Sequence, residues 1–160
     1  MHINLIKIDY LNPEHQAHLL YLLNHYAEDA MGGGKPLSNY AKENLTTELA
    51  KRPNAFTFIA YADGKPAGIA NCFEGFSTFA SKPLINIHDL AVHTDFRGKG
   101  ISKMLMQAVS DEGKKRQCCK ITLEVLTGNK IAFNAYLKFG FKPYELKPEN
   151  GSATFMELYL

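Results

Sequence analysis

The chain has 160 residues, which is enough for one domain of ordinary size and too few for two. Hydrophobic residues make up 46% and charged residues 21%, a balance typical of globular proteins and unlike that of disordered chains. Eighteen basic and sixteen acidic side chains leave a formal charge of +2, too mild by itself to indicate a nucleic-acid surface. We therefore expect a single folded domain over residues 1–160.

The start of the chain and its cysteines bear on the cellular compartment. The first residues lack a basic segment ahead of a long apolar run, so no signal peptide is predicted. No later stretch approaches the ~20 apolar residues of a membrane-spanning helix. The three cysteines, Cys72, Cys118 and Cys119, are an odd number without a Cys-x-x-Cys pattern, which predicts neither a disulfide framework nor a zinc site. We expect a cytoplasmic protein with no metal, no membrane contact and no nucleic-acid partner.

Predicted strands and helices alternate along the chain. Period-two alternation of apolar residues marks the strands, and spacings of three and four mark the helices. Proline, glycine and asparagine at the ends of these runs supply caps and turns. In chain order we expect a strand at 3–9, helices at 13–29 and 39–52, a hairpin of strands 55–62 and 66–76, a strand at 84–92, a helix beginning at 101, a strand at 120–126, a helix at 129–139, and strands at 141–146 and 153–158. This order predicts an α/β protein with a mixed sheet and helices on both faces.

The most informative segment is Arg97-Gly98-Lys99-Gly100, between a predicted strand and the helix that follows it. The two glycines let backbone N–H groups turn toward one point, where the first turn of the helix also offers unpaired donors and a positive dipole end. Arg97 and Lys99 add positive charge without having to be the main ligands. The segment therefore predicts a phosphate-binding loop.

The spacing of the glycines narrows the choice of phosphate-containing ligand. A dinucleotide fingerprint needs a third glycine where Lys103 stands, and no Gly-Lys-Ser/Thr occurs, so NAD and ATP are disfavoured. Residues 97–102 instead resemble the acetyl-coenzyme A signature of the GNAT family of N-acetyltransferases, Arg/Gln-x-x-Gly-x-Gly/Ala, with Ser102 as the last residue. Residues 129–141 resemble the family's second signature, Asn-x-x-Ala-x-x-x-Tyr-x-x-x-Gly-Phe, at every fixed position.

The resemblance covers roughly residues 56–141 well and the first fifty only in outline. It implies the GNAT fold, a mostly antiparallel central sheet splayed between its fourth and fifth strands, with about four helices on both faces. It also implies acetyl-CoA as cosubstrate, with its diphosphate on the glycine loop, its pantetheine arm along the fourth strand, and no metal. The implied cofactor-binding residues are Leu90, Ala91, Val92, Arg97, Gly98, Lys99, Gly100, Ile101, Ser102 and Asn129.

Acetyl transfer to an amine requires two proton movements. An amine with a pKa of about 10.4 must lose a proton, and the departing thiolate is better protonated as it leaves. By resemblance, Tyr136 is the general acid beside the sulfur. For the base, Glu124 matches the ribosomal-protein branch of the family and ranks first. Asp89 and then His88 follow, because residues 86–90 resemble the diamine acetyltransferase branch, and water shared among these groups is a further route.

The expected function is transfer of acetyl from acetyl-CoA to a primary amine, by direct attack in a ternary complex. The diamine-like strand favours a small-molecule acceptor, whereas residues 123–141 lean toward a protein N terminus, so a protein or peptide acceptor stays an alternative. A non-catalytic acyl-CoA-binding module is the alternative from another class. The glycine-rich loop at residues 31–36 is expected to move over the acceptor, and the apolar C-terminal strand offers an edge for a homodimer.

Overall fold

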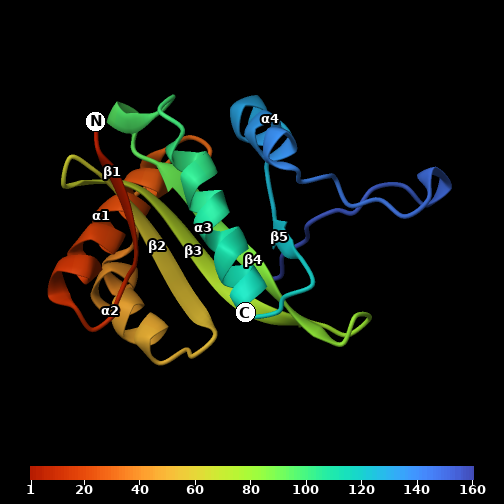
Figure 1. Ribbon diagram of the computed structural model, residues 1–160, viewed down its shortest axis with the longest axis horizontal. Helices are drawn as coiled ribbons and strands as arrows, with labels where there is room; N and C mark the ends of the chain where they lie inside the picture. Colours follow the sequence, from red (N-terminus) through yellow and green to blue (C-terminus); the bar gives the residue numbers. More distant parts are fainter. The chain divides into compact units, whose positions relative to one another are not determined.

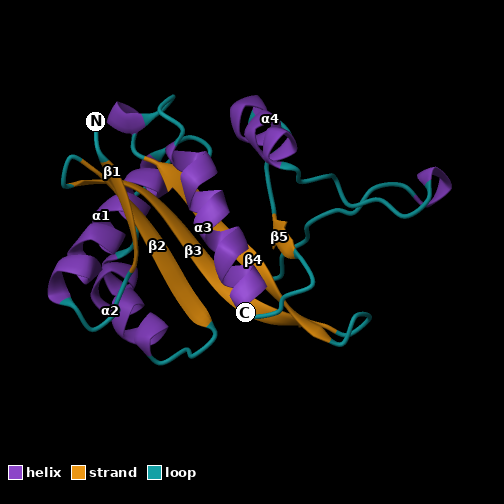
Figure 2. Cartoon of the chain, viewed as in Figure 1, coloured by secondary structure: helices purple, strands orange, loops and turns teal.

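The computed structural model describes all residues from 1 to 160, and they form two compact units, residues 1–123 and residues 124–160. The first unit is built on a five-stranded sheet whose strands lie in chain order (Figures 1 and 2). Strands β1 to β4 pair antiparallel and β5 joins β4 in parallel, so the expected mixed sheet is confirmed. The strands are β1 (Ile3–Lys7), β2 (Ala55–Ala62), β3 (Lys65–Ser77), β4 (Lys82–Val92) and β5 (Ile121–Leu123).

Three α-helices belong to the first unit, and they start where the sequence predicts. The side chain of Asn12 accepts two backbone N–H groups of the first turn of α1, and Pro13 follows it. Ser38 caps α2 through one backbone N–H in the same way. None of the helices is both long enough and apolar enough to cross a membrane. The bounds are α1 (Pro13–Glu28), α2 (Asn39–Ala50) and α3 (Ile101–Lys115).

These helices cover opposite faces of the sheet. Ile69 on β3 is fully buried in one cluster with Leu19 of α1 and Leu49 of α2. The preceding residue, Gly68, faces the other side of the sheet, because a Cβ built there would lie 2.9 Å from the Ile101 side chain of α3. Successive strand residues face opposite sides, so α1 and α2 cover one face and α3 the other, as expected (Figure 1).

The close approach of α3 to β3 at Gly68 makes a first prediction. Gly68→Ala should lower the free energy of unfolding by about 1–3 kcal/mol, because the new methyl group overpacks the contact with Ile101 and also lies 3.1 Å from the carbonyl oxygen of Ala91. Urea denaturation measures the loss. Gly75→Ala is the matched control on the same strand, because its Cβ would meet only ordinary contact with Leu84 at 3.4 Å. Equal stability of the two variants would contradict this packing.

An irregularity in β4 changes the direction of two side chains. Asn71 on β3 lies opposite Asp89, and the next residue, Cys72, lies opposite Ile87. His88 is therefore an extra residue in β4, which makes this position a β-bulge. A bulge interrupts the alternation of faces, so His88 and Asp89 need not point to opposite sides of the sheet.

The pairing of β4 with β5 is brief. Only residues 85–87 of β4 pair with β5, and β4 then continues to Val92 without a partner on that side. The strand predicted at 120–126 is correspondingly shorter, ending at Leu123, because the chain leaves the sheet there. The expected separation of the fourth and fifth strands is confirmed, and it leaves one backbone edge of residues 88–92 open.

The second unit contains α4 (Lys130–Phe139), which the sequence predicts at nearly the same bounds. The Asn129 side chain caps this helix by accepting a backbone N–H of the first turn at 3.2 Å. Gly140 ends the helix with a φ of 120°, and the next residue, Phe141, donates its N–H to the carbonyl of Tyr136 at 3.0 Å.

The two strands predicted after α4 are absent, so that prediction is wrong. Residues 141–160 contain a single bridge between Glu145 and Ser152 and one short 3-10 helix, η2 (Pro148–Asn150). Pro143 and Pro148 cannot donate to a strand ladder. A two-stranded ribbon without a third strand is also marginal in water, so the apolar pattern of this segment does not suffice to form strands.

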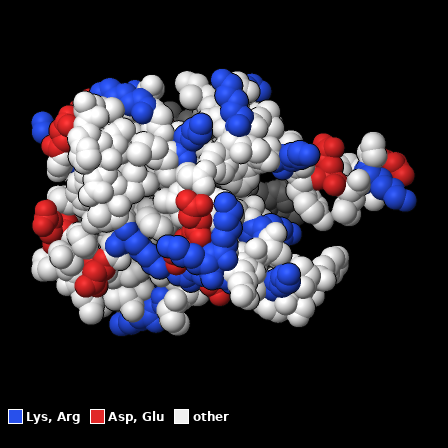
Figure 3. Space-filling view, viewed as in Figure 1, with Lys and Arg blue, Asp and Glu red and all other residues white.

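The charged side chains of α3 are largely paired with neighbours. Arg116, at the end of the helix, contacts Glu112 at 2.8 Å and Glu74 of β3 at 2.9 Å, and Lys7 of β1 contacts Glu112 at 2.6 Å. Figure 3 shows Lys and Arg lying among Asp and Glu on this face. These ion pairs connect the end of α3 to β1 and β3.

Candidate active site

The glycine loop has the backbone geometry that its sequence predicts. A short 3-10 helix, η1 (Thr94–Phe96), precedes it, and Gly98 and Gly100 have φ values of 74° and 78°. Gly100 is the N-cap residue that precedes α3, and it supplies no side-chain cap, in contrast to the capped starts of α1 and α2. No acceptor in the protein takes the N–H groups of residues 98–101. The loop therefore presents several backbone donors at the positive end of a helix dipole.

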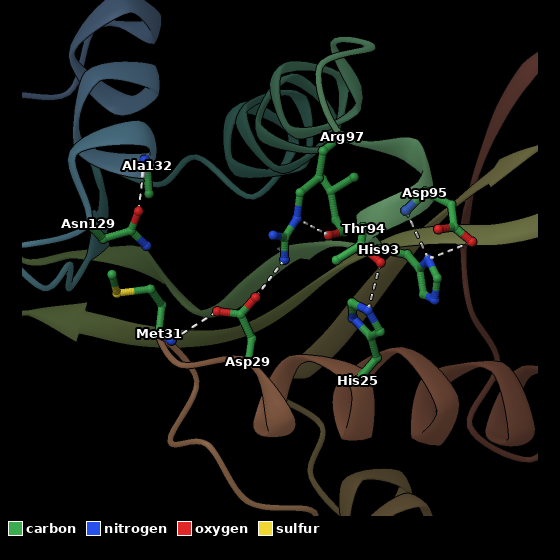
Figure 4. Close-up of polar contacts among 10 residues, drawn as sticks. His25, Asp29, Met31, His93, Thr94, Asp95, Arg97, Asn129 and Ala132 are labelled. Atoms are coloured by element: carbon green, nitrogen blue, oxygen red, sulfur yellow. Dashed lines mark hydrogen bonds and ion pairs between the residues drawn. The ribbon is translucent and has the colours of Figure 1, made fainter.

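The Arg97 side chain is hydrogen-bonded within the protein. Its Nε donates to the carbonyl of Val92 at 3.1 Å, and its Nη2 donates to the Asp29 carboxylate at 2.8 Å (Figure 4). The guanidinium thus ties the glycine loop to the end of α1. The neighbouring Lys99 donates to the carbonyl of Asp95 at 3.1 Å, which folds its stem back along the loop.

Asp29 links two loops that are far apart in sequence. The hydrogen bond from Arg97 and a second one from the N–H of Met31 lower the pKa of this carboxyl below its usual value. Met31 opens the glycine-rich segment that follows α1, whereas Arg97 belongs to the glycine loop before α3. One carboxylate therefore holds the start of both segments (Figure 4).

A histidine pair lies beside this link. The rings of His25 and His93 stack with their centroids 4.0 Å apart, and Nε2 of His93 shares a 2.8 Å hydrogen bond with the hydroxyl of Tyr21. Burial, followed by the nearby charges of His93 and Arg97, lowers the pKa of His25. No group of three or more His, Cys, Asp or Glu side chains is placed to hold a metal ion.

The lowered pKa of His25 predicts a pH-dependent stability. A group whose pKa is lower in the folded state gives stability that is complete above its unfolded pKa and is lost as pH falls through the folded value. Lowering the pH from about 7.5 to about 5.5 should therefore reduce Tm. Asp29, whose pKa is also lowered, adds its loss only at more acidic pH.

Thermal melts of His25→Gln at the two pH values should show a smaller drop in Tm than the wild type, because the titrating ring is gone. His2→Gln, which changes an exposed histidine, should leave the wild-type drop intact. The same drop in all three proteins would contradict the role of the stacked pair.

The β4 bulge brings both of its candidate bases to one face. The Asp89 carboxylate accepts a hydrogen bond from the side-chain amide of Asn71 at 3.0 Å, and the His88 ring packs edge-on against Phe73 at 5.6 Å. Asn71 and Phe73 are two apart on β3 and share the face that α1 covers. Burial and the charges of the nearby carboxylates, first Asp89, raise the pKa of the Tyr26 phenol. The half-buried carboxylate of Asp89 thus lies close to the end of α1.

The remaining predicted residues belong to the second unit. Asn129 uses its side-chain oxygen to cap α4, and Tyr136 is half-buried on the same helix, with its ring 6.0 Å from that of Phe141. Glu124 is exposed at the start of this unit. The first unit therefore holds Asp89, His88 and residues 90–102.

Sequence reasoning missed several residues around the loop and β4. Asp29 and Asn71 form hydrogen bonds to predicted residues that are distant in sequence, and Tyr26 interacts electrostatically with Asp89. No local sequence pattern marks these three residues. The only available signal is the type of residue, a polar Asn71 in an otherwise apolar run of β3.

Comparison with known proteins agrees with the motifs. The profile of the family described as the acetyltransferase (GNAT) family matches residues 14–141. The chain belongs to the GNAT family. An uncharacterized N-acetyltransferase of Methanocaldococcus jannaschii is 32% identical over 61% of this chain and 44% of its own length. Streptothricin acetyltransferase of Streptomyces lavendulae is 37% identical over 53% of this chain and 43% of its own length. The chain thus spans less than half the length of these curated relatives.

Solved structures share the GNAT fold at low sequence identity. AAC(6')-Iy in complex with a CoA-containing bisubstrate analogue aligns over 100% of both chains, with a TM-score of 0.78 and 20% identity. A transcriptional regulator from Bacillus halodurans covers 99% of this chain and 100% of its own, with a TM-score of 0.80 and 18% identity. At such identities the likeness concerns the fold, and the mixed open sheet and four α-helices of this GNAT chain agree with it.

Proposed function

We propose that this GNAT protein transfers the acetyl group of acetyl-CoA to a primary amine of a small molecule. The observation that carries the proposal is the glycine loop. Gly98 and Gly100 adopt positive φ values, and the N–H groups of residues 98–101 have no acceptor within the protein. Converging amides at an uncapped helix start suit a diphosphate, which is the part of acetyl-CoA that the family signature serves.

The open edge of β4 supports a place for the rest of the cosubstrate. Beyond residue 87 the backbone of β4 pairs only with β3, so its other edge can bond an extended pantetheine arm as an added strand. His93 donates its N–H to Ala67 of β3, so by alternation the backbone groups of Ala91 also face β3, and those of Leu90 and Val92 face the open edge. The carbonyl of Val92 already accepts Nε of Arg97, which leaves Leu90 as the better candidate for such bonds. Arg97 itself acts in this proposal by fixing the loop, since its side chain is held by Asp29.

The acceptor would be a cationic amine. Asp89 gives the α1 side of β4 an acidic character, and its negative charge helps to raise the pKa of the Tyr26 phenol after burial. This side therefore suits an ammonium group. Two relatives are named as a streptothricin acetyltransferase and an aminoglycoside acetyltransferase, and both names specify a small-molecule substrate. These names support a small-molecule amine as the acceptor. A relative named as a ribosomal-protein alanine acetyltransferase keeps the protein N terminus as the second candidate. The narrower diamine acceptor rests on residues 86–90 alone.

The reaction needs a base before attack and an acid after it. By resemblance Glu124 ranks before Asp89 as the base. We place Asp89 first here because its carboxylate is half-buried and accepts a hydrogen bond from Asn71, whereas Glu124 is exposed. In the proposed ternary complex, Asp89 takes a proton from the bound ammonium, with Glu124 and His88 as the other candidates. The amine lone pair then forms the bond to the acetyl carbonyl carbon, and the C–S bond breaks. Tyr136 gives its proton to the departing thiolate. The nitrogen, which carries one extra proton after the attack, loses that proton to water, and water returns a proton to the Tyr136 oxygen. The products are an acetamide and coenzyme A.

An acceptor screen tests the proposal. The protein is incubated with acetyl-CoA and with polyamines, aminoglycosides, streptothricin-like amines, amino acids or peptides, while thiol release and product mass are followed. We expect a mass gain of one acetyl group on a small-molecule amine. Acetylation of peptides alone would select the protein-acceptor alternative, and coenzyme A binding with no transfer to any amine would select a binding module.

A further inference from the structure

A chain of hydrogen bonds crosses three strands and ends on Asp89. The Tyr10 hydroxyl lies 2.8 Å from Oγ1 of Thr57, and Oγ1 of Thr57 donates to Oδ1 of Asn71 at 2.7 Å. Nδ2 of Asn71 donates to Oδ2 of Asp89 at 3.0 Å. Thr57 and Asn71 are 0% and 4% exposed, so their polar atoms are shielded from water and bond to each other instead.

The chemistry of these groups fixes the direction of every bond. A carboxylate oxygen only accepts, so the amide of Asn71 must turn its NH2 toward Asp89 and its oxygen toward Thr57. Thr57 has one proton, which it gives to that oxygen. The Tyr10 hydroxyl must therefore donate to Thr57. The three donors point the same way along the chain, toward the carboxylate.

Core packing alone does not account for these residues. Ile59 and Ile69 are the fully buried neighbours two residues away on β2 and β3, and apolar side chains of similar size would fill the same space. A buried amide and hydroxyl gain little over such a replacement, because both must first lose their bonds to water. We call the side chains of Tyr10, Thr57, Asn71 and Asp89 the relay. No buried side-chain atom of the relay lacks a hydrogen-bond partner.

We propose that Tyr10, Thr57 and Asn71 are positioning residues that hold Asp89 toward the acceptor amine, an inference that rests on the proposed acetyltransferase function. The Asn71 amide binds one carboxylate oxygen, Oδ2, and no protein hydrogen bond uses the other. A fixed carboxylate with one oxygen available can receive an ammonium group in a single orientation. The relay thereby sets how the amine is aligned for proton loss and attack.

The sharpest variant is Thr57→Val, which removes the hydroxyl at nearly constant volume. We expect kcat/KM for the amine to fall about tenfold, because the Asn71 oxygen loses its donor and the amide is no longer held. The affinity for acetyl-CoA, measured by calorimetry, should not change. Thr57→Ser, which restores a hydroxyl, should recover most of the lost rate. Thr46→Val makes the same chemical change at a buried threonine of α2 outside the relay, and should leave kcat/KM unchanged.

A double-mutant cycle separates positioning from general damage. Thr57→Val is also made in an Asp89→Asn background, where no carboxylate remains to be held. If the relay acts through Asp89, the valine substitution should cause no further loss there. An equal fold-loss in both backgrounds, or no loss in either, would overturn the proposal. Thr57→Val/Asn71→Leu, which leaves no buried amide unpaired, serves in place of Thr57→Val should that variant fold poorly.

A spectroscopic readout keeps this result distinct from failure of the proposed function. In 15N-labelled protein, the side-chain NH2 signals of Asn71 should move on Asp89→Asn and on Thr57→Val, and stay in place on Thr46→Val. If the wild type acetylates no amine but these shifts occur, the enzymatic function fails while the relay to Asp89 stands. If the wild type is active and the Asn71 NH2 signals do not shift on Asp89→Asn, the proposal that the relay holds Asp89 is refuted.

Discussion

Replacing Tyr136 with phenylalanine should lower kcat by about 100-fold or more, because general acid catalysis typically contributes at least that much. The phenol is the proton donor that the proposed reaction assigns to the departing thiolate. Phenylalanine keeps the ring that packs near Phe141, so α4 should remain intact. Steady-state kinetics with a saturating amine acceptor measure the loss, and calorimetry should show unchanged binding of acetyl-CoA.

The control for this substitution is Tyr144→Phe in the same unit. Tyr144 is 65% exposed and lies outside both signatures, so removing its hydroxyl should leave kcat unchanged. A fully active Tyr136→Phe would show that the acid is another group or is not needed. Loss of acetyl-CoA affinity in that variant would instead assign Tyr136 to cofactor binding.

The parts of the fold that follow local rules agree with the sequence. The cap at Asn12, the cap at Ser38 and the turn at Asp63-Gly64 each depend on neighbouring residues, and the structure shows all three. Gly98 and Gly100 adopt positive φ values, which glycine permits at no steric cost. For such features the sequence carries nearly all of the needed information.

The features that failed or were missed depend on distant partners. The tail residues after Phe141 have a strand-like pattern, but a strand exists only when a neighbour accepts its bonds, and one bridge is all that forms. The contact of Asp29 with Arg97 spans 68 residues, and that of Thr57 with Asn71 spans 14. These contacts depend on the register of the sheet and on how α1 packs against it, and a local sequence pattern specifies neither.

The glycine loop yields the second large effect, through a charge placed at Gly100. Asparagine and aspartate both tolerate the left-handed conformation that its φ of 78° requires, and a Cβ there would meet no atom within 4 Å. Gly100→Asp should therefore fold, but it should weaken acetyl-CoA binding by about 100-fold at low salt, because a carboxylate near a diphosphate is strongly repelled.

Gly100→Asn is the matched comparison, since it has nearly the same shape without the charge, and it should bind acetyl-CoA far more tightly than the aspartate variant. Calorimetry with S-acetylpantetheine, which lacks the diphosphate, should give equal affinities for the two variants. Added salt should narrow the gap for acetyl-CoA, because the repulsion is screened at an exposed loop. Equal binding of acetyl-CoA by both variants would place the diphosphate away from Gly100, and the loop would lose the role on which the proposed reaction depends.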